Sequence, residues 1–123
     1  MKRIWIGIGF LVVLLVAGLV VMKMMDHQLG EISDTLEQAA QAKTWEQSVT
    51  LAKDAEKGWK SKKKLITALT DHSQIDTIEV LFARLGVYGQ RKEETEFAAT
   101  CAQLAEAVHA LEENHRLAWY NLL

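Results

Sequence analysis

The sequence predicts an all-α protein in which an N-terminal transmembrane helix is followed by a small antiparallel helical bundle of about four helices. The chain contains no proline, and its apolar residues recur at three- and four-residue steps, as on one face of a helix. A long uncharged run near the N-terminus predicts the membrane helix. We expect an anchor over residues 1–25 and an extracytoplasmic helical-bundle domain over residues 26–123.

The membrane helix is predicted over Ile4–Met22, nineteen consecutive positions without a charge. At 1.5 Å per residue this helix would be roughly 28 Å long, close to the hydrocarbon thickness of a bilayer. Thirteen of the nineteen residues are Ile, Leu, Val or Phe, and each favours insertion by roughly 0.3–0.6 kcal/mol. We therefore expect the chain to contact the lipid bilayer through this segment.

Basic residues beside the span predict its orientation. Lys2 and Arg3 precede the span, whereas Lys23 alone follows it closely, and basic flanks tend to remain cytoplasmic. We expect a single-pass cell-membrane protein with a cytoplasmic N-terminus and an extracytoplasmic C-terminal domain. The alternative is a cleaved signal peptide, but the apolar run exceeds the usual 7–15 residues or so and no Ala-x-Ala site follows it.

Composition limits what the domain over residues 26–123 can do. Eleven Lys and Arg against sixteen Asp and Glu give it a formal charge of −5, which argues against general nucleic-acid binding. Cys101 is the single cysteine, so no intramolecular disulfide can form. It falls on an apolar helical stripe, where we expect an inert core thiol, with an intermolecular disulfide or a reactive thiol as the alternative.

The first two helices of the domain are predicted from their apolar stripes and caps. The first continues from the membrane and carries Leu29, Ile32 and Leu36 up to about Ala42. Thr44-Trp45-Glu46-Gln47 has the pattern of a capping box. The helix that it opens should run for about 25 residues. Its apolar face consists of Trp45, Val49, Ala52, Ala55, Trp59, Ile66 and Leu69.

The last two helices follow a turn at 71–74. The third should end at Gly86 or Gly89, since either glycine could supply a left-handed C-terminal cap. Its stripe consists of Ile75, Ile78, Leu81, Phe82, Leu85 and Tyr88. Glu93 and Glu94 suit the N-terminus of the fourth helix. That helix carries Phe97, Cys101, Leu104, Val108 and Leu111. The short links predict antiparallel neighbours.

A characteristic order of residues runs through this part of the chain: Trp45-Glu46, Trp59, Leu65-Ile66, Asp71-His72, Ile75-Asp76, Ile78-Glu79, Ala83-Arg84-Leu85 and Tyr88, with Asn121-Leu122-Leu123 at the end. In these residues the sequence resembles the domain-of-unknown-function-4363 family. The resemblance implies a short single-pass membrane protein of endospore-forming Firmicutes without an assigned activity. Gly58 and Gly86 depart from the family's pattern, which usually has longer side chains there.

His72, Asp76 and Glu79 are the candidate metal ligands. They fall within about 60° of one another around one helix, beside the apolar stripe. One imidazole and two carboxylates could bind a divalent metal, but metal sites usually draw ligands from more than one element. We favour a polar helix start and keep the metal site as an alternative. Arg84 is expected to pair with an acid on a neighbouring helix.

Glu106 and His109, and likewise Glu112 and His115, match the Glu-x-x-His step of di-iron bundles. In those proteins the two copies lie on different helices. Here both lie on one helix, with Glu106 and Glu112 about 120° apart. The sequence therefore does not predict a di-iron site.

Five lysines, namely Lys57, Lys60, Lys62, Lys63 and Lys64, gather within eight residues. The favoured interpretation is a solvated helix flank. The alternative is a surface that binds lipid headgroups, an anionic polymer or an acidic protein. The tryptophans Trp45, Trp59 and Trp119 are expected in the core, although two of them near one end could line a groove for a partner helix.

These observations predict a non-enzymatic interaction or scaffold domain at the outer face of the cytoplasmic membrane. Its partner would be another protein or a second copy, with no nucleic acid, small-molecule substrate, cofactor or catalytic residue. The alternatives are a metal-binding domain and an anionic-polymer or lipid-surface binder. Candidate interaction residues are Lys57, Lys60, Lys62, Lys63, Lys64, Trp45, Trp59 and Arg84.

Overall fold

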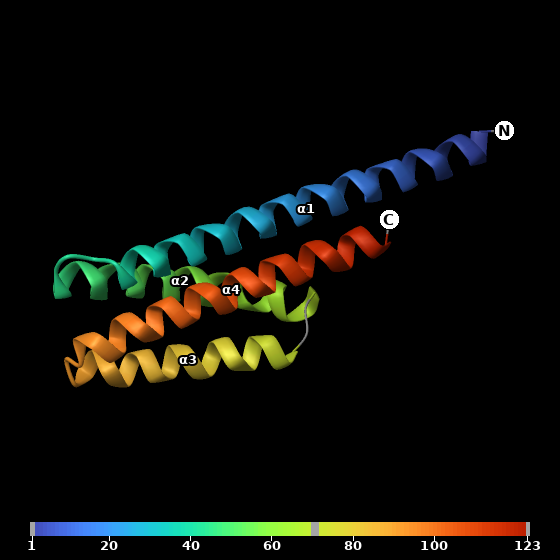
Figure 1. The fold of residues 1–123 in the computed structure, drawn as a ribbon. Coiled ribbons are helices and arrows are strands. Elements are labelled where there is room, and N and C mark those ends of the chain that lie inside the picture. Colours follow the sequence, from blue (N-terminus) through green and yellow to red (C-terminus); the bar gives the residue numbers. More distant parts are fainter. Residues whose placement is uncertain (1, 70–71, 123) are drawn as a thin grey trace.

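The structure is a computed structural model that describes residues 2–69 and 72–122, apart from the side chains of residues 25, 26, 69, 115 and 118–122. The described residues form four helices in chain order: α1 (Lys2–Ala40), α2 (Trp45–Leu69), α3 (His72–Gln90) and α4 (Glu94–Leu122). Each helix runs antiparallel to the one before it (Figure 1), as the short connections favour. The predicted all-α fold is confirmed.

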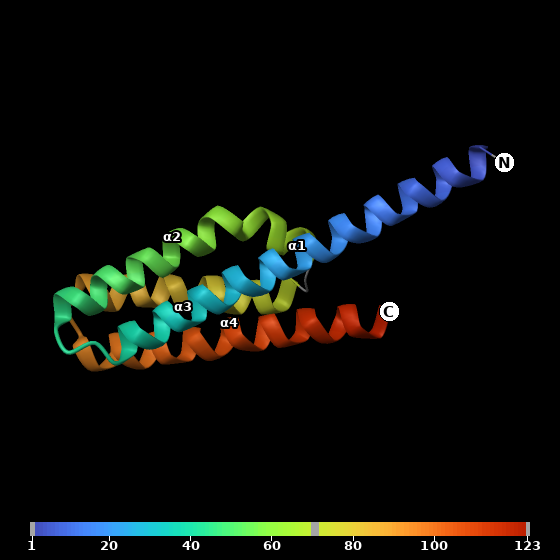
Figure 2. The ribbon, with the colours of Figure 1, turned by 90° about the horizontal axis from the view of Figure 1, so that it is seen from above.

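α1 is one helix whose two halves have different surroundings. Its C-terminal half packs in the bundle, whereas its N-terminal half extends beyond it (Figures 1 and 2). From Ile4 to Val21 the exposed large apolar side chains show 37% to 74% of their surface. The helix is long and apolar enough to cross a membrane. Exposing these apolar side chains to water is unfavourable, whereas the hydrocarbon of a bilayer would be a favourable surrounding for this half of the helix.

Within the bundle, α1 packs along α2 and along α4, and α3 packs along α4. In Figure 2, α2 and α4 lie on opposite sides of α1. α2 and α3 make few contacts with each other. α1 and α4 are therefore the helices around which the other two are arranged.

The predicted apolar stripes meet in a single core. Fully or almost fully buried side chains come from all four helices: Leu29, Ile32, Leu36, Ala39, Ala52, Ala55, Trp59, Ile66, Ile75, Ile78, Phe82, Leu85, Phe97, Cys101, Leu104, Ala105, Val108 and Leu111. The helical spacing of these residues predicted their burial correctly, because residues three and four apart share one helix face.

The start of α2 is as predicted, but the end of α3 is not. The hydroxyl of Thr44 accepts the N–H of Gln47 at 3.2 Å, which confirms the N-terminal cap. α3 continues past Gly86 and Gly89 to Gln90, and the left-handed residue is Lys92, with φ 55°. The predicted glycine cap is therefore wrong.

A Schellman motif takes its place at the end of α3. The N–H of Glu93 donates to the carbonyl of Tyr88 at 3.1 Å, and that of Lys92 donates to Gly89 at 3.3 Å. Gly89 has a packing role instead of a turn role. A Cβ at this position would lie 3.3 Å from Cε2 of Phe97, so the glycine lets the ring approach α3 closely.

Two buried serines fix the register of the helices around α1. The Ser33 hydroxyl donates to the carbonyl of Ala105 on α4 at 3.0 Å. The Ser48 hydroxyl of α2 donates to the carbonyl of Ala39 at 2.7 Å. Because α2 and α4 both run antiparallel to α1, their C-terminal ends return toward its protruding half (Figure 1).

Candidate functional site

The lysine-rich segment 57–64 lies on the C-terminal half of α2. Lys60 Nζ lies 2.9 Å from Glu56 on the same helix, as expected of a solvated flank. Lys63 Nζ lies 3.2 Å from Oε1 of Glu79 on α3, so it links two helices. Within the described part of the chain, no ion pair within 4 Å is found for Lys57, Lys62 or Lys64.

Trp59 is the largest of the fully buried side chains, with 1% of its surface exposed. Its indole N–H donates to Oε1 of Glu79 at 2.9 Å, and its ring centroid lies 6.3 Å from that of Phe82. The predicted core position is confirmed. Trp59 is therefore wrong as an interaction candidate, because its ring is covered by the bundle.

Glu79 is held by two donors from α2. The hydrogen bond from Trp59 is the largest cause that lowers the pKa of this carboxyl below its ordinary value. Partial burial opposes that shift, and Lys63 and Lys60 add to it. Glu79 therefore stays ionised near neutral pH and connects α2 with α3.

The candidate metal ligands are not assembled into a site. His72 and Asp76 are exposed, whereas Glu79 bonds to Trp59 and Lys63 on α2. Among the described residues, no group of three or more His, Cys, Asp or Glu side chains could hold a metal ion. The sequence placed these three residues correctly on one helix but could not show that α2 engages one of them.

Among the described residues, Arg84 does not have the partner that the sequence predicts. Its side chain is exposed, and it makes no ion pair within 4 Å among the residues that the structure describes. Trp45 is half-buried and packs edge-to-face on Phe97, with ring centroids 4.9 Å apart. It packs against the core as expected. The side chain of Trp119 lies outside the described residues.

A groove of about 670 Å³ lies between α1 and α4. Its lining includes the small residues Ala40, Ala98, Ala99, Ala102 and Ala105 and the ionisable residues Asp34, Glu37, Glu106 and His109. His109 lies 3.4 Å from Glu113 and 3.8 Å from Glu112 on its own helix. The groove therefore offers an apolar floor with an acidic rim.

A second groove, of about 380 Å³, lies where α2 and α3 make few contacts. Its lining includes Ala52, Leu85 and Phe97, with Lys53 and Glu56 beside them. Gly86 and Gly89 of α3 also line this groove. Its floor is continuous with the core of the bundle, so it reflects incomplete closure between the two helices.

The two serines that bond across helices were not singled out from the sequence. Ser33 and Ser48 are each 7% exposed. Ser33 lies four residues after Leu29 and three before Leu36, so its place on the buried stripe could have been found by helical spacing. A buried hydroxyl there needs a partner, which the carbonyl of a neighbouring helix provides.

Cys101 is fully buried, as predicted. Burial raises the pKa of its thiol to about 12, so almost no thiolate is present at neutral pH. Because the thiolate is the reactive form, the side chain behaves as a small apolar core residue.

Together these features define a class of protein: a helical bundle whose first helix continues as an uncharged apolar segment. The chain belongs to the family described as Domain of unknown function (DUF4363), whose model matches residues 19–122. No curated protein and no solved structure matches it. The match begins within the apolar run of α1 and covers all of α2 and α3.

Proposed function

We propose that the protein is a single-pass membrane protein whose helical domain acts by contact with another protein, or with a second copy, at the outer face of the cytoplasmic membrane. The observation that carries the proposal is the contrast within α1. Most of its nineteen uncharged positions protrude from the bundle, and their large apolar side chains are exposed. In water this exposure is unfavourable, whereas in a bilayer it is what insertion requires.

The chemistry of the bundle supports a role by contact. Of the described ionisable groups with a shifted pKa, Glu79 and Lys60 are held by neighbours on α2 and Cys101 by burial in the core. Each shift thus has a packing cause, and none requires a substrate. Tethering to a bilayer would also raise the effective concentration of the domain for a weakly binding partner in the same membrane.

The test begins with location and orientation. A reporter fused after Leu123 should be active outside the cytoplasm, and the fusion should stay in the membrane fraction after alkaline carbonate. A cytoplasmically active reporter would reverse the orientation, and release into the carbonate supernatant would contradict the anchor.

The test continues with the mode of action. Photo-crosslinking of the intact chain in membranes should capture the same partner from the parent and from the His72→Ala variant. Zinc, iron or manganese bound stoichiometrically to the parent and lost in His72→Ala would favour the metal-binding alternative.

A further inference from the structure

We propose that the end of the bundle from which α1 emerges is a binding site for the anionic phosphate headgroups of a bilayer. A set of basic residues, here named the basic collar (Lys23, Lys62 and Lys64), would meet the phosphates, and the uncharged end of α4 would enter the interface below them. The inference rests on the proposed membrane anchor and adds a second, lateral contact between domain and lipid.

The register of α4 against α1 is the first step. Ser33 is bonded to Ala105, and a Cβ at Gly30 would lie 3.8 Å from Oε2 of Glu112. Since the helices are antiparallel, position 116 lies level with about positions 22–26 of α1. Arg116 of α4 and Lys23 of α1 therefore lie at a similar level along the axis of the bundle. Beyond them both helices are uncharged, to Leu122 on α4 and back to Ile4 on α1.

The register of α2 against α1 brings the end of the lysine-rich segment 57–64 to the same level along the bundle. Ser48 is bonded to Ala39, and a Cβ at Gly58 would lie 3.4 Å from Cγ1 of Ile32. Position 64 is therefore level with about positions 23–26 of α1. After Lys64 the sequence carries no charge until Asp71. Three helices thus pass from basic to uncharged residues at one level.

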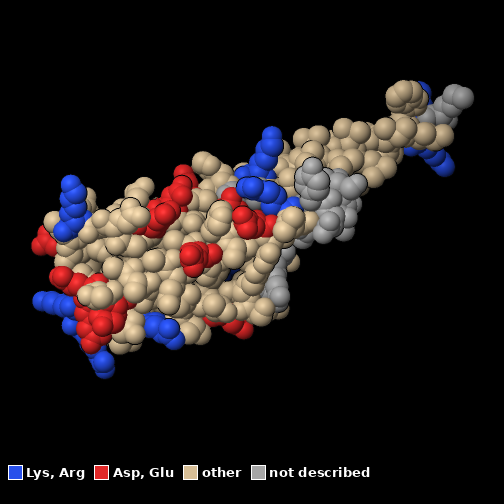
Figure 3. All heavy atoms as spheres, in the orientation of Figure 1, with Lys and Arg blue, Asp and Glu red and all other residues tan. Residues whose placement is uncertain are grey.

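Of the collar lysines, Lys23 and Lys64 are exposed and Lys62 is half-buried. Lys63 is bound to Glu79 and Arg116 to Glu112, the latter at 3.1 Å. In the described part of the chain no ion pair within 4 Å involves the three collar residues. Figure 3 shows Lys and Arg atoms, with Asp and Glu atoms beside them, where α1 leaves the bundle, and the protruding helix uncharged up to its N-terminal end.

Apolar side chains are exposed at the same end. Leu65 follows the collar on α2 and is 42% exposed, and Leu117 follows Arg116 on α4 and is 60% exposed. The α4 sequence then continues through Trp119 and Tyr120, residue types that are enriched at membrane interfaces. A bilayer surface favours lysine ammonium groups at the level of the phosphates with apolar residues beneath them.

The test uses the full chain in lipid nanodiscs, in a Trp5→Phe background that removes the tryptophan at the other end of the span. Lipids brominated near the glycerol end of the acyl chain should quench part of the remaining emission. That quenched part should disappear in Trp119→Phe and persist in Trp45→Phe, because Trp45 lies at the far end of the bundle.

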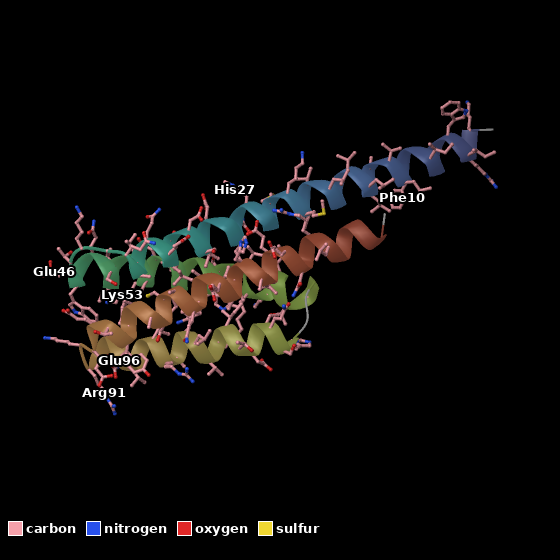
Figure 4. All side chains as sticks on the ribbon, in the orientation of Figure 1. Phe10, His27, Glu46, Lys53, Arg91 and Glu96 are labelled. Carbon is pink, nitrogen blue, oxygen red and sulfur yellow. The ribbon has the colours of Figure 1, made fainter. Side chains whose placement is uncertain are left out.

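The charge of the lipid tests the collar. At equal content, brominated phosphatidylglycerol should quench Trp119 more than brominated phosphatidylcholine, since each lysine near an anionic surface raises the affinity for that surface about fivefold. The double variant Lys62→Gln/Lys64→Gln should lose most of this preference, since of the collar it keeps only Lys23. The matched control Lys53→Gln/Arg91→Gln, which changes two exposed cations away from the collar (Figure 4), should retain it.

Two results would overturn the inference while leaving the anchor intact: unquenched Trp119 in a chain that is incorporated into the discs, or equal lipid preference in both double variants. Failure of the chain to enter nanodiscs, with release by alkaline carbonate, would instead overturn the proposed anchor. Circular dichroism of each variant shows whether the helices are retained.

Discussion

The two long seams of the bundle, α1–α4 and α2–α3, are closed to very different extents. Along α1–α4 the helices pack extensively beside a groove of about 670 Å³ that is lined partly by alanines, and the buried Ser33 bonds across the seam. Along α2–α3 the groove is smaller, about 380 Å³, but the helices make few contacts. Two kinds of contact cross that seam: Glu79 accepts from Trp59 and pairs with Lys63, and the Trp59 ring lies 6.3 Å from that of Phe82.

The difference between the seams indicates where the stability of the domain is concentrated. Along the α1–α4 seam the packing is spread over many apolar residues, so no single residue dominates it. The α2–α3 seam depends on Trp59, which is buried, stacks near Phe82 and donates to Glu79. Trp59 is therefore the residue of the α2–α3 seam whose substitution should change the free energy of unfolding most.

Trp59→Ala should give the largest effect, a loss of about 3–5 kcal/mol in the free energy of unfolding. The substitution leaves a cavity the size of an indole and removes one donor from Glu79. The measurement is chemical unfolding of the full chain in detergent micelles, followed by the emission of the remaining tryptophans. Against a typical total of about 5–15 kcal/mol, the loss could unfold the domain.

Ser33→Ala at the other seam removes one hydrogen bond and should cost about 0.5–1.5 kcal/mol. A loss below about 1 kcal/mol in Trp59→Ala would mean that the α2–α3 seam does not depend on Trp59.

Most of the fold could be predicted from the sequence because helical periodicity reports burial directly. Thr44 as a cap and Trp59 and Cys101 as core residues were all predicted. The end of α3 could not be. Gly86 and Gly89 satisfy the local rule for a helix stop, but the approach of Phe97 to Gly89 makes a glycine useful inside the helix. Tertiary packing overrode a local signal.

Glu79→Gln should change the pH dependence of stability. The pKa of Glu79 is lowered from 4.5 in the folded protein, so the carboxylate stabilises the fold above that value. This contribution is lost as pH falls through the lowered folded pKa. We therefore expect the parent to be more stable than Glu79→Gln at pH 7, with the difference shrinking as the pH is lowered below about 4.5.

The measurement is the unfolding midpoint of both proteins at a series of pH values. Asp76→Asn is the control, because Asp76 is an exposed acid on the same helix and should shift the midpoint little at any pH. A difference between parent and Glu79→Gln that stays constant through the acid range would mean that the Glu79 carboxylate does not stabilise the seam.

The candidate site was less predictable than the fold because its residues are assembled from different helices. Spacing placed His72, Asp76 and Glu79 on one face of α3, but the donors that engage Glu79 lie on α2. Likewise the five lysines appeared as one cluster in sequence, yet Lys60 and Lys63 are paired, and the register of α2 against α1 brings Lys64 level with about positions 23–26. Register between helices separates them, and a single helical pattern contains no information about it.

The smallest expected effect compares two glycines of α3 that line the looser seam. Gly86 has open space for an added methyl group, because a Cβ there would meet nothing within 4 Å. Gly86→Ala should therefore stabilise the fold by about 0.5–1 kcal/mol, since alanine loses less backbone freedom on folding than glycine. At Gly89 a Cβ would lie 3.3 Å from Cε2 of Phe97, so the ring would have to shift and part or all of that gain should be lost.

The unfolding midpoints of Gly86→Ala and Gly89→Ala, measured side by side with the parent, test this difference. Equal gains would show that Phe97 moves freely at this end of the seam, which would extend the looseness of α2–α3 to the contact between α3 and α4.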